Sequence, residues 1–428
     1  MSGAAQVLDI VIVGAGLSGL AAAISCSLSG HHVIVLESAK ELAEVGAGLQ
    51  ITPNASRLFM LWGVMDNIEK LAAEPQTLTV HRYADGNVLA HDGRFSERMR
   101  QLYGAPFIDM HRVDVQRILA KRAKELGAEI MLDTRVKSID FDTAEVTTTT
   151  GAKYRGDLIV AADGLWSKCR ECFLGSRDPP LPTGDLAYRI VLTLDQISDP
   201  ALRQWISSPT VHFWIGPNAH VVGYSVRSGT MYNIVLLVPD DLPEAVSKQP
   251  GSVEEMRKLF QGWDPILNRF LECVSKVDKW KLMHRPELES WVNEKGNFVL
   301  IGDSCHPMLP YLAQGANSSM EDGAVLGLLL RRTAASIQLP AVLKVFQQLR
   351  KSRGEAIVRE TFKQRHDFHM VDGPEQVERD KLFLSQLGKD TIECAFPSRW
   401  TCPTVQPFLY GYDAEKEVAA ALKQMETA

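Results

Sequence analysis

The chain has little of several features that would indicate other classes of protein. It holds 7 cysteines in 428 residues, which is too few for a disulfide framework, and an odd number leaves at least one thiol free. No apolar run approaches the roughly 20 residues of a membrane-spanning helix, and no basic segment with a cleavage site precedes the first apolar run. We therefore expect a cytoplasmic protein without a membrane span.

Charge of one sign is not in large excess either. The 46 Lys and Arg residues against 52 Asp and Glu residues give a formal net charge of -6, without long single-sign runs. Nucleic-acid binding would need a basic surface, so we exclude it. The chain is 45% hydrophobic, enough for a sizeable core in one to three domains.

The first forty residues predict a β-α-β unit. An apolar run at 7–13 predicts a parallel strand that is buried on both faces. Residues 17–29 predict a helix, and 33–36 predict a second apolar strand. This is the local context in which a glycine-rich turn becomes a specific signal rather than an ordinary loop.

The turn of this unit contains three glycines with separate roles. Gly14 permits the tight turn, Gly16 lets the backbone approach a pyrophosphate, and Gly19 lets the helix pack on the strand. The helix N-terminus offers N–H groups and a partial positive charge to phosphates. Glu37 follows the second strand, where a carboxylate accepts a hydrogen bond from a ribose hydroxyl. The unit predicts dinucleotide binding without deciding between a nicotinamide and a flavin.

Two later segments place a carboxylate where an apolar strand ends. The strand that begins at Leu158 ends at Asp163, and the strand 298–301 ends just before Asp303. A loop rich in Pro, Gly and Asn follows, and we expect a helix to begin near Ser318. A carboxylate at a strand end and a second helix N-terminus suit a polyol arm and a polarised ring. A flavin carries both.

Together these stretches resemble the FAD-dependent aromatic hydroxylases with the p-hydroxybenzoate hydroxylase fold (group A flavoprotein monooxygenases). The likeness is closest to the salicylate-hydroxylase-like monooxygenases of filamentous fungi. It extends to EVGAGLQITPNASRLFMLWGV (44–64), MHRVDVQRIL (110–119) and FLYGYDAEKEV (408–418). The resemblance implies an α/β protein with a Rossmann-type FAD lobe, an antiparallel-sheet substrate lobe and C-terminal helices. The implied segments are 1–75, 107–182 and 283–340 for the FAD lobe, 76–106 and 183–282 for the substrate lobe, and 341–428 for the C-terminal helix and tail.

The resemblance also implies roles for single residues around a tightly bound FAD. The residues that would hold its ADP half are Gly14, Gly16, Gly19 and Glu37. Arg112 would reach the cofactor from the MHR segment, Asp163 would lie in a second fingerprint, and Asp303 would bind the ribityl hydroxyls. The residues that would line the flavin ring are Pro310, Gly315, Ala316 and Asn317. NAD(P)H would visit without a Rossmann domain of its own, which agrees with the lack of a second GxGxxG.

Between about 183 and 282 the pattern predicts strands. Residues 210–215, 220–226 and 232–238 are separated by short turns and predict an antiparallel meander. His220 and Tyr224 share one face of a period-2 strand. Together with Arg189 on a preceding strand, they are our candidate catalytic residues. An arginine and a tyrosine can bind the phenolate or carboxylate of a small aromatic substrate.

The reaction implied by the resemblance is the hydroxylation of a phenol or a salicylate-like aromatic. NAD(P)H would reduce FAD, and dioxygen would form a flavin C4a-hydroperoxide that delivers oxygen to the ring. One alternative is a flavin-dependent epoxidase or dearomatising oxygenase of secondary metabolism that acts on an indole or a polyketide. Another is a catalytically silent FAD-binding protein.

The sequence favours no metal site. Cys169 and Cys172 lack a second pair, and His366 and His369 are more typical of a solvated helix face. The adjacent Glu321 and Asp322 diverge on a helix, and we expect a structural role for them. A monomer and a homodimer are both compatible with the sequence.

Overall fold

A computed structural model describes residues 7–42, 47–332, 338–390, 392 and 394–427. The predicted FAD-lobe segments include 1–6, 43–46 and 333–337, which lie outside the described residues. The same holds for the first three residues of the 44–64 motif and for 391, 393 and 428 of the tail. Among the described residues no helix is long and apolar enough to cross a membrane.

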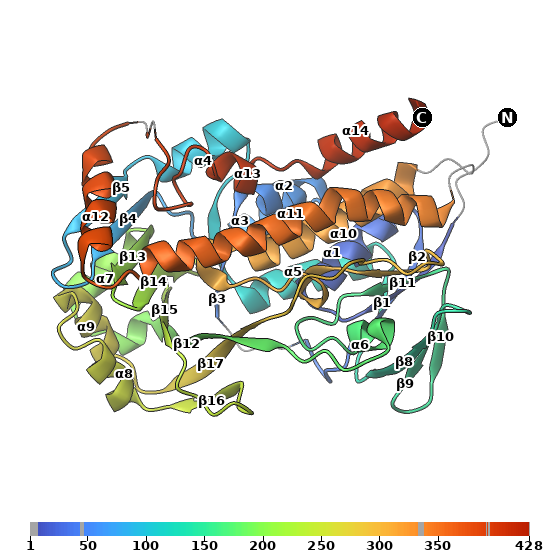
Figure 1. The fold of residues 1–428 in the computed structure, drawn as a ribbon, viewed down its shortest axis with the longest axis horizontal. Helices are drawn as coiled ribbons and strands as arrows, with labels where there is room; N and C mark the ends of the chain where they lie inside the picture. The colour runs from blue at the N-terminus through green and yellow to red at the C-terminus, as the bar shows by residue number, and fades with distance from the viewer. Residues whose placement is uncertain (1–6, 43–46, 333–337, 391, 393, 428) are drawn as a thin grey trace.

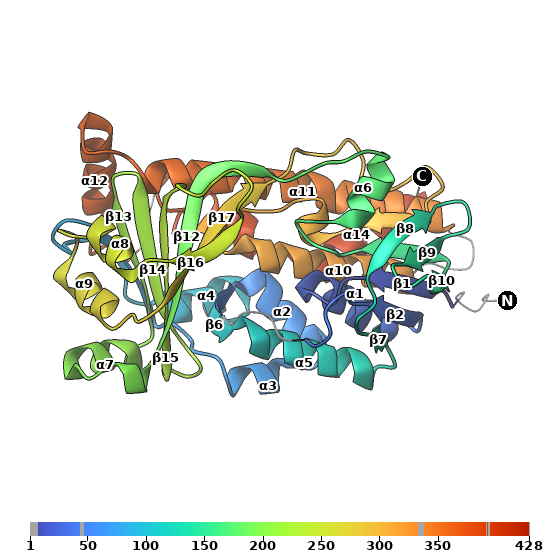
Figure 2. The same ribbon diagram turned by 90° about the horizontal axis from the view of Figure 1, so that it is seen from below.

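A five-stranded parallel sheet forms one end of the molecule (Figures 1 and 2). Its order is β18-β11-β1-β2-β7. The bounds are β1 Asp9–Val13, β2 His32–Leu36, β7 Glu129–Met131, β11 Leu158–Ala161 and β18 Phe298–Leu300. β11 is apolar and buried throughout, and β1 is apolar and buried after the exposed Asp9 that begins it, as expected of parallel strands with both faces covered. At one edge of the sheet, β11 pairs with β18, a strand that lies far from it in the sequence.

Close helix packing surrounds this sheet. Helix α1 (Leu17–Leu28) packs against α10 (Gln314–Arg332), where a Cβ on Gly323 would lie 2.4 Å from the Ala22 nitrogen. Glycine therefore sets how closely the two helices approach. The long helix α11 (Leu339–Phe368) runs along the molecule past both sheets (Figure 1).

The second sheet has eight strands in the order β16-β17-β12-β15-β14-β13-β4-β5. The bounds are β4 Thr77–Arg82, β5 Val88–Asp92, β12 Leu181–Thr193, β13 Thr210–Gly216, β14 Ala219–Val226, β15 Met231–Pro239, β16 Lys248–Gly251 and β17 Val277–His284. The three predicted meander strands are β13, β14 and β15, which pair antiparallel. The one parallel pair of this sheet is β13 with β4.

The two faces of this sheet differ because side chains alternate along each strand. On β12, Leu186, Tyr188 and Ile190 are buried in a core that includes residues of α7, α8 and α9. The intervening Ala187 and Arg189 line a cavity on the opposite face. The sheet is thus a wall between a helical layer and a binding space.

Smaller elements complete the fold. The remaining strands are β3 Gly48–Ile51 paired with β6 Ile108–His111, and the sheet of β8 Val136–Asp140, β9 Glu145–Thr148 and β10 Lys153–Arg155. The remaining α-helices are α2 Pro53–Leu61, α3 Met65–Glu69, α4 Phe95–Tyr103, α5 Arg112–Glu125, α6 Lys168–Leu174, α7 Pro200–Ser207, α8 Val253–Leu259, α9 Pro265–Glu272, α12 Pro374–Gln386, α13 Gln406–Tyr410 and α14 Ala414–Thr427. The 3-10 turns are η1 Leu194–Gln196, η2 Gly302–Ser304 and η3 Pro310–Leu312.

The helix that we expected near Ser318 begins one turn earlier, at Gln314. Gly315 and Asn317 are weak helix formers, but tertiary contacts hold this first turn. Gln314 Nε2 donates to Thr52 Oγ1 at 3.0 Å, and Asn317 Nδ2 donates to the Gln50 carbonyl at 3.0 Å. Sequence propensity alone does not include these contacts.

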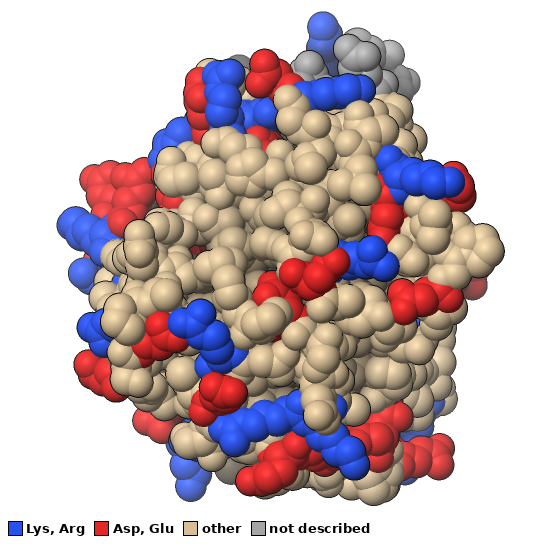
Figure 3. Space-filling view, turned by 90° about the vertical axis from the view of Figure 1, so that its left-hand side faces the viewer, with Lys and Arg blue, Asp and Glu red and all other residues tan. Residues whose placement is uncertain are grey.

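The surface at the end opposite the parallel sheet carries no large patch of one charge. Figure 3 shows Lys and Arg interspersed with Asp and Glu around a wide uncharged area.

Candidate active site

One continuous cavity of about 760 Å³ lies between the two sheets. It begins at the carboxyl ends of the parallel strands, where open α/β sheets bind their ligands, and continues along the eight-stranded wall. The predicted site residues that line it are Gly14, Gly16, Glu37, Arg112, Asp163, Arg189, Tyr224, Asp303, Pro310, Gly315 and Ala316. The cavity therefore brings residues of both sheets together in one site.

The glycine-rich turn has the geometry of a phosphate cradle. Gly14 has φ +103°, and a Cβ there would lie 2.5 Å from the Ala162 carbonyl oxygen. A Cβ on Gly19 would lie 1.9 Å from the Gly14 carbonyl oxygen, whereas Gly16 has no neighbour within 4 Å on that side. Gly19 therefore acts in packing and does not line the cavity. No side chain caps α1, so its first N–H groups remain available to an anion.

Glu37 is fixed at the end of β2 by the main chain. Its Oε2 accepts from the Ala15 N–H at 2.7 Å, and its Oε1 accepts from the Ala39 N–H at 2.7 Å. Oε1 also accepts from Ser38 Oγ at 3.2 Å, and Oε2 can accept a second hydrogen bond. Glu37 can therefore bind a ribose hydroxyl while it remains fixed to the turn.

Asp163 organises the turn at the end of β11. Its Oδ1 accepts from Ser167 Oγ at 2.5 Å and its Oδ2 from the Cys169 N–H at 2.9 Å. Burial raises the pKa of the Asp163 carboxyl. Cys169 is buried and Cys172 half-buried, and both are free thiols. The contribution of the CxxC stretch to this turn is the hydrogen bond from the Cys169 N–H to Asp163.

Pro310, at the start of η3, and Gly315 and Ala316, in the first turn of α10, line the cavity. Asn317 departs from our expectation, because it is fully buried and does not line the cavity. Its Oδ1 accepts from the Thr52 N–H at 3.1 Å, and its amide nitrogen reaches β3, as described above. Asn317 therefore fixes the start of α10 against β3 instead of facing the ring.

Arg189 and Tyr224 face the cavity from neighbouring parts of the wall. The Arg189 guanidinium lies 4.9 Å from the centre of the Trp280 ring, and Lys248 Nζ lies 4.1 Å from it. Tyr224 is 4% exposed, and burial raises the pKa of its phenol well above the usual range. Trp280 and Lys248 also line the cavity. We had not identified them because no motif connects residues on separate strands.

His220 shares a face with Tyr224 but does not line the cavity. Its Nδ1 lies 2.7 Å from His369 Nε2, and its ring lies 5.3 Å from the Tyr311 ring. Burial lowers the pKa of His220 well below its usual range. The end of α11 covers His220, and this structural environment does not support the catalytic role that we expected. His369 is buried, whereas His366 is exposed.

Glu321 and Asp322 belong to a buried ion network. Arg350 Nη1 lies 2.7 Å from a Glu321 oxygen, Arg350 Nε lies 2.7 Å from an Asp322 oxygen, and Arg353 also pairs with Glu321. His306 Nε2 lies 2.6 Å from Asp322. The network ties α10, whose first turn lines the cavity, to α11.

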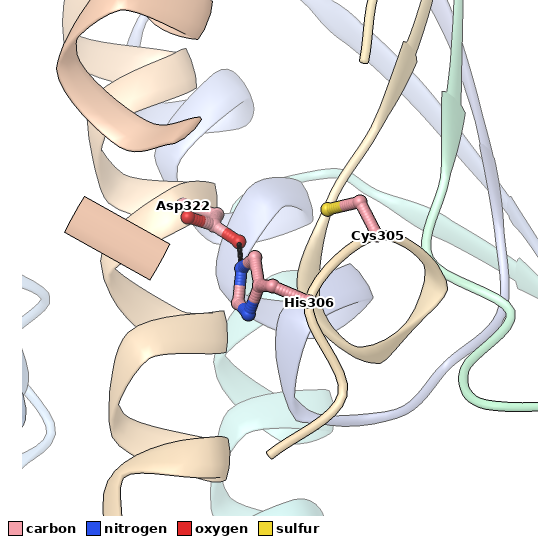
Figure 4. Close-up of side chains that lie close together, drawn as sticks. All are labelled: Cys305, His306 and Asp322. Atoms are coloured by element: carbon pink, nitrogen blue, oxygen red, sulfur yellow. Dashed lines mark hydrogen bonds and ion pairs between the residues drawn. The ribbon is translucent and has the colours of Figure 1, made fainter. Parts of the chain in front are cut away.

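Cys305, His306 and Asp322 lie close enough to be compared with a metal site. Figure 4 shows the His306 ring directed at Asp322. The Cys305 thiol lies within 4.8 Å of both and donates to the Gly302 carbonyl at 3.3 Å. Arg350 already provides a positive charge to the Asp322 carboxylate. Interaction with Asp322 raises the pKa of His306 against the effect of burial, so a histidine–aspartate ion pair accounts for the arrangement.

Comparisons with known proteins agree with this geometry. Residues 7–361 match the FAD binding domain family. FAD-dependent monooxygenase OpS4 of Beauveria bassiana (strain ARSEF 2860) is 50% identical over 410 residues, which cover 95% of each chain. The 3-hydroxybenzoate 6-hydroxylase of Polaromonas naphthalenivorans (strain CJ2) is 33% identical over 381 residues, covering 88% of this chain and 92% of the relative.

Solved structures show the same fold. A substrate complex of salicylate hydroxylase has a TM-score of 0.78 at 20% identity and covers 98% of both chains. CtdE in complex with FAD and a substrate has a TM-score of 0.82 at 21% identity, covering 98% of this chain and 100% of that chain.

The residues present fit FAD. The cradle around Gly14 and Gly19 admits no side chain, and α1 presents uncapped N–H groups. The carboxylates of Glu37 and Asp303 both line the same cavity. Together with the match to the family, this shows that the chain belongs to the FAD-binding family of FAD-dependent monooxygenases that contains the aromatic hydroxylases.

Proposed function

We propose that this monooxygenase uses NAD(P)H and dioxygen to hydroxylate a small aromatic substrate that carries a phenol or carboxylate group. The observation that carries the proposal is the position of Arg189 and Tyr224. Both line the cavity from the eight-stranded wall, and Pro310 of η3 and Gly315 of α10 line the same cavity. Two relatives are named for related chemistry, the 3-hydroxybenzoate 6-hydroxylase and a 3-amino-4-hydroxybenzoate 2-monooxygenase of Streptomyces platensis that is 30% identical.

When bound, FAD supplies the redox chemistry, because it takes electrons from NAD(P)H and activates dioxygen. The ADP half would be held by the α1 N-terminus and Glu37, and the ribityl arm by Asp303. The protein's own task is to place the substrate ring against the flavin and to exclude water from the reacting atoms. Pro310, Gly315 and Ala316 would line the flavin side of that space.

Arg189 would bind the acidic group of the substrate. A guanidinium forms charge-assisted hydrogen bonds with a carboxylate or phenolate, and the Trp280 face below it restricts its position. Tyr224 would donate a hydrogen bond to the same substrate, because burial keeps its phenol protonated at neutral pH. An anionic phenol is richer in electrons and reacts more readily with an electrophilic oxygen donor.

The test is incubation of the FAD-loaded protein with NADH or NADPH, ¹⁸O₂ and a panel of phenols, salicylates and other hydroxybenzoates. Mass spectrometry should find a single ¹⁸O atom in an aromatic product. Parallel measurement of CO₂ separates simple from decarboxylative hydroxylation.

An Arg189→Met variant should raise the KM for benzoates by about tenfold or more, consistent with the loss of a hydrogen bond to a charged group. Lys276→Met provides a matched control, since Lys276 is exposed and does not line the cavity. Consumption of NAD(P)H with only hydrogen peroxide as product, for every member of the panel, would refute the proposed substrate class.

A further inference from the structure

A polar corner of the cavity forms where β3 crosses the eight-stranded sheet. Tyr224 and Asn233 are directly paired on β14 and β15. The Gly48 N–H donates to Asn233 Oδ1 at 2.8 Å. A Cβ on Gly48 would lie 2.7 Å from Tyr224 Oη and 2.5 Å from Asn233 Cγ. β3 therefore lies directly against the part of the wall that carries Tyr224.

Gln50, two residues further along β3, has its amide orientation set by Asp109. The two residues are opposite each other in the β3–β6 register, and Gln50 Nε2 donates to Asp109 Oδ1 at 3.0 Å. Burial raises the pKa of Asp109 well above its usual range. A neutral acid whose carbonyl oxygen accepts from Gln50 avoids an unpaired buried charge. The contact directs the Gln50 nitrogen toward Asp109.

The other end of the Gln50 amide is an acceptor that no described protein group uses. Gln50 is 5% exposed and lines the cavity. Within the described part of the chain, no group donates a hydrogen bond to Gln50 Oε1, and Tyr224 Oη has no hydrogen-bond partner there. Asn233 Nδ2 also has no partner in the same part of the chain, but Asn233 is fully buried behind Gly48 and does not line the cavity, so Gln50 and Tyr224 are the two groups that a ligand can reach. Polar groups of this kind in a nearly buried wall indicate a ligand that completes their hydrogen bonds.

We propose that Gln50 is a specificity-determining residue whose Oε1 accepts a hydrogen bond from a ring hydroxyl of the substrate, and that Asp109 is its positioning residue. This inference rests on the proposed function. It narrows the substrate to an aromatic acid that carries a free hydroxyl as well as the acidic group that Arg189 binds. The corner belongs to the substrate wall through Tyr224, which lines the cavity, and this favours a substrate hydroxyl over an N–H of the flavin.

The experiment compares dihydroxybenzoates with their monomethyl ethers, because methylation removes the donor and keeps the ring. Binding to the FAD-loaded protein is measured by titration of the flavin absorbance, and turnover is measured as kcat/KM. The wild type should prefer the hydroxyl compound about tenfold in both, as expected for one hydrogen bond. Gln50→Met should bring that preference close to one, while FAD content and the ligand-free flavin spectrum stay unchanged.

Two variants of Asp109 separate positioning from folding. Asp109→Asn keeps an oxygen that can accept from Gln50 and should keep the preference for the hydroxyl compound, whereas Asp109→Leu should lose it. Gln101→Met, at an exposed position of α4, is the control for the glutamine-to-methionine change and should behave as wild type.

The outcomes distinguish this inference from the proposed function. Hydroxylation with an unchanged preference in Gln50→Met would overturn the inference alone. An altered ligand-free flavin spectrum or FAD affinity with the preference intact would assign Gln50 to the flavin, and would also overturn it. A wild type that binds and hydroxylates no member of the panel would overturn both.

Discussion

Replacement of Arg350 by methionine should destabilise the protein strongly and loosen its hold on FAD. Arg350 is fully buried, and it pairs at 2.7 Å with both Glu321 and Asp322. Removing one partner of a buried ion pair costs about 3–5 kcal/mol, because the remaining charge is left without compensation. Arg353 still pairs with Glu321 and His306 still pairs with Asp322. We therefore expect the lower end, about 3 kcal/mol, or roughly a hundredfold change in the folding equilibrium.

The assay is urea unfolding of wild type and variant, followed by tryptophan fluorescence, with FAD content measured in parallel. The control is Arg359→Met, because Arg359 is 57% exposed and pairs with a 49% exposed Glu287; such a surface pair contributes about 0–1 kcal/mol. FAD release should accompany the loss of stability in Arg350→Met, because α10 carries both the network and the cavity residues Gly315 and Ala316. Equal unfolding midpoints for the two variants would refute this reasoning.

Further predictions concern single residues. Asp303→Ala should weaken FAD binding roughly 10- to 100-fold through the loss of a charged acceptor, whereas the exposed Asp195→Ala should not; full FAD occupancy of Asp303→Ala in dialysis would contradict the role of Asp303. His220→Asn should lower the melting temperature and leave the substrate KM unchanged. Tyr224→Phe should raise the substrate KM and leave the melting temperature unchanged. A raised KM in His220→Asn would place His220 in the site. Burial lowers the pKa of His212 well below 6.5, so its neutral form contributes stability above about pH 6.5 that is lost as the pH falls toward its folded pKa. His212→Gln should therefore show a smaller drop in melting temperature between pH 7.5 and 5.5 than the wild type, and an equal drop would exclude His212 as its source.

The network around Asp322 should show its own pH dependence. The pKa of the Asp322 carboxyl is lowered to about 2 because the His306 and Arg350 charges outweigh the opposing effect of burial. The stability that it contributes is therefore complete above about pH 4 and is lost as the pH falls toward 2. Asp322 is consequently ionised at every pH at which FAD binding would be measured. Its ion pairs with His306 and Arg350 therefore do not change the FAD-binding results described above.

The sequence by itself determined the parts of the protein that depend on local backbone constraints. Gly14 and Gly19 occupy positions where a side chain would meet main-chain atoms, and their spacing after an apolar strand is visible in the chain. Strand-end carboxylates such as Asp163 and Asp303 are also visible, since a strand ends where its apolar run ends. These local signals predicted a dinucleotide site, and the resemblance of the ordered motifs to a known family predicted FAD and the fold class, which the comparisons confirm.

Only the tertiary structure decided which side chains meet. Period-2 alternation placed His220 and Tyr224 on one face, but the end of α11 covers only His220. Asp322 and Arg350 are 28 residues apart, and Gln50 and Asp109 are 59 apart. Such pairs form when distant segments pack together, and their energies depend on burial and on the opposite partner, which local propensity and periodicity do not encode.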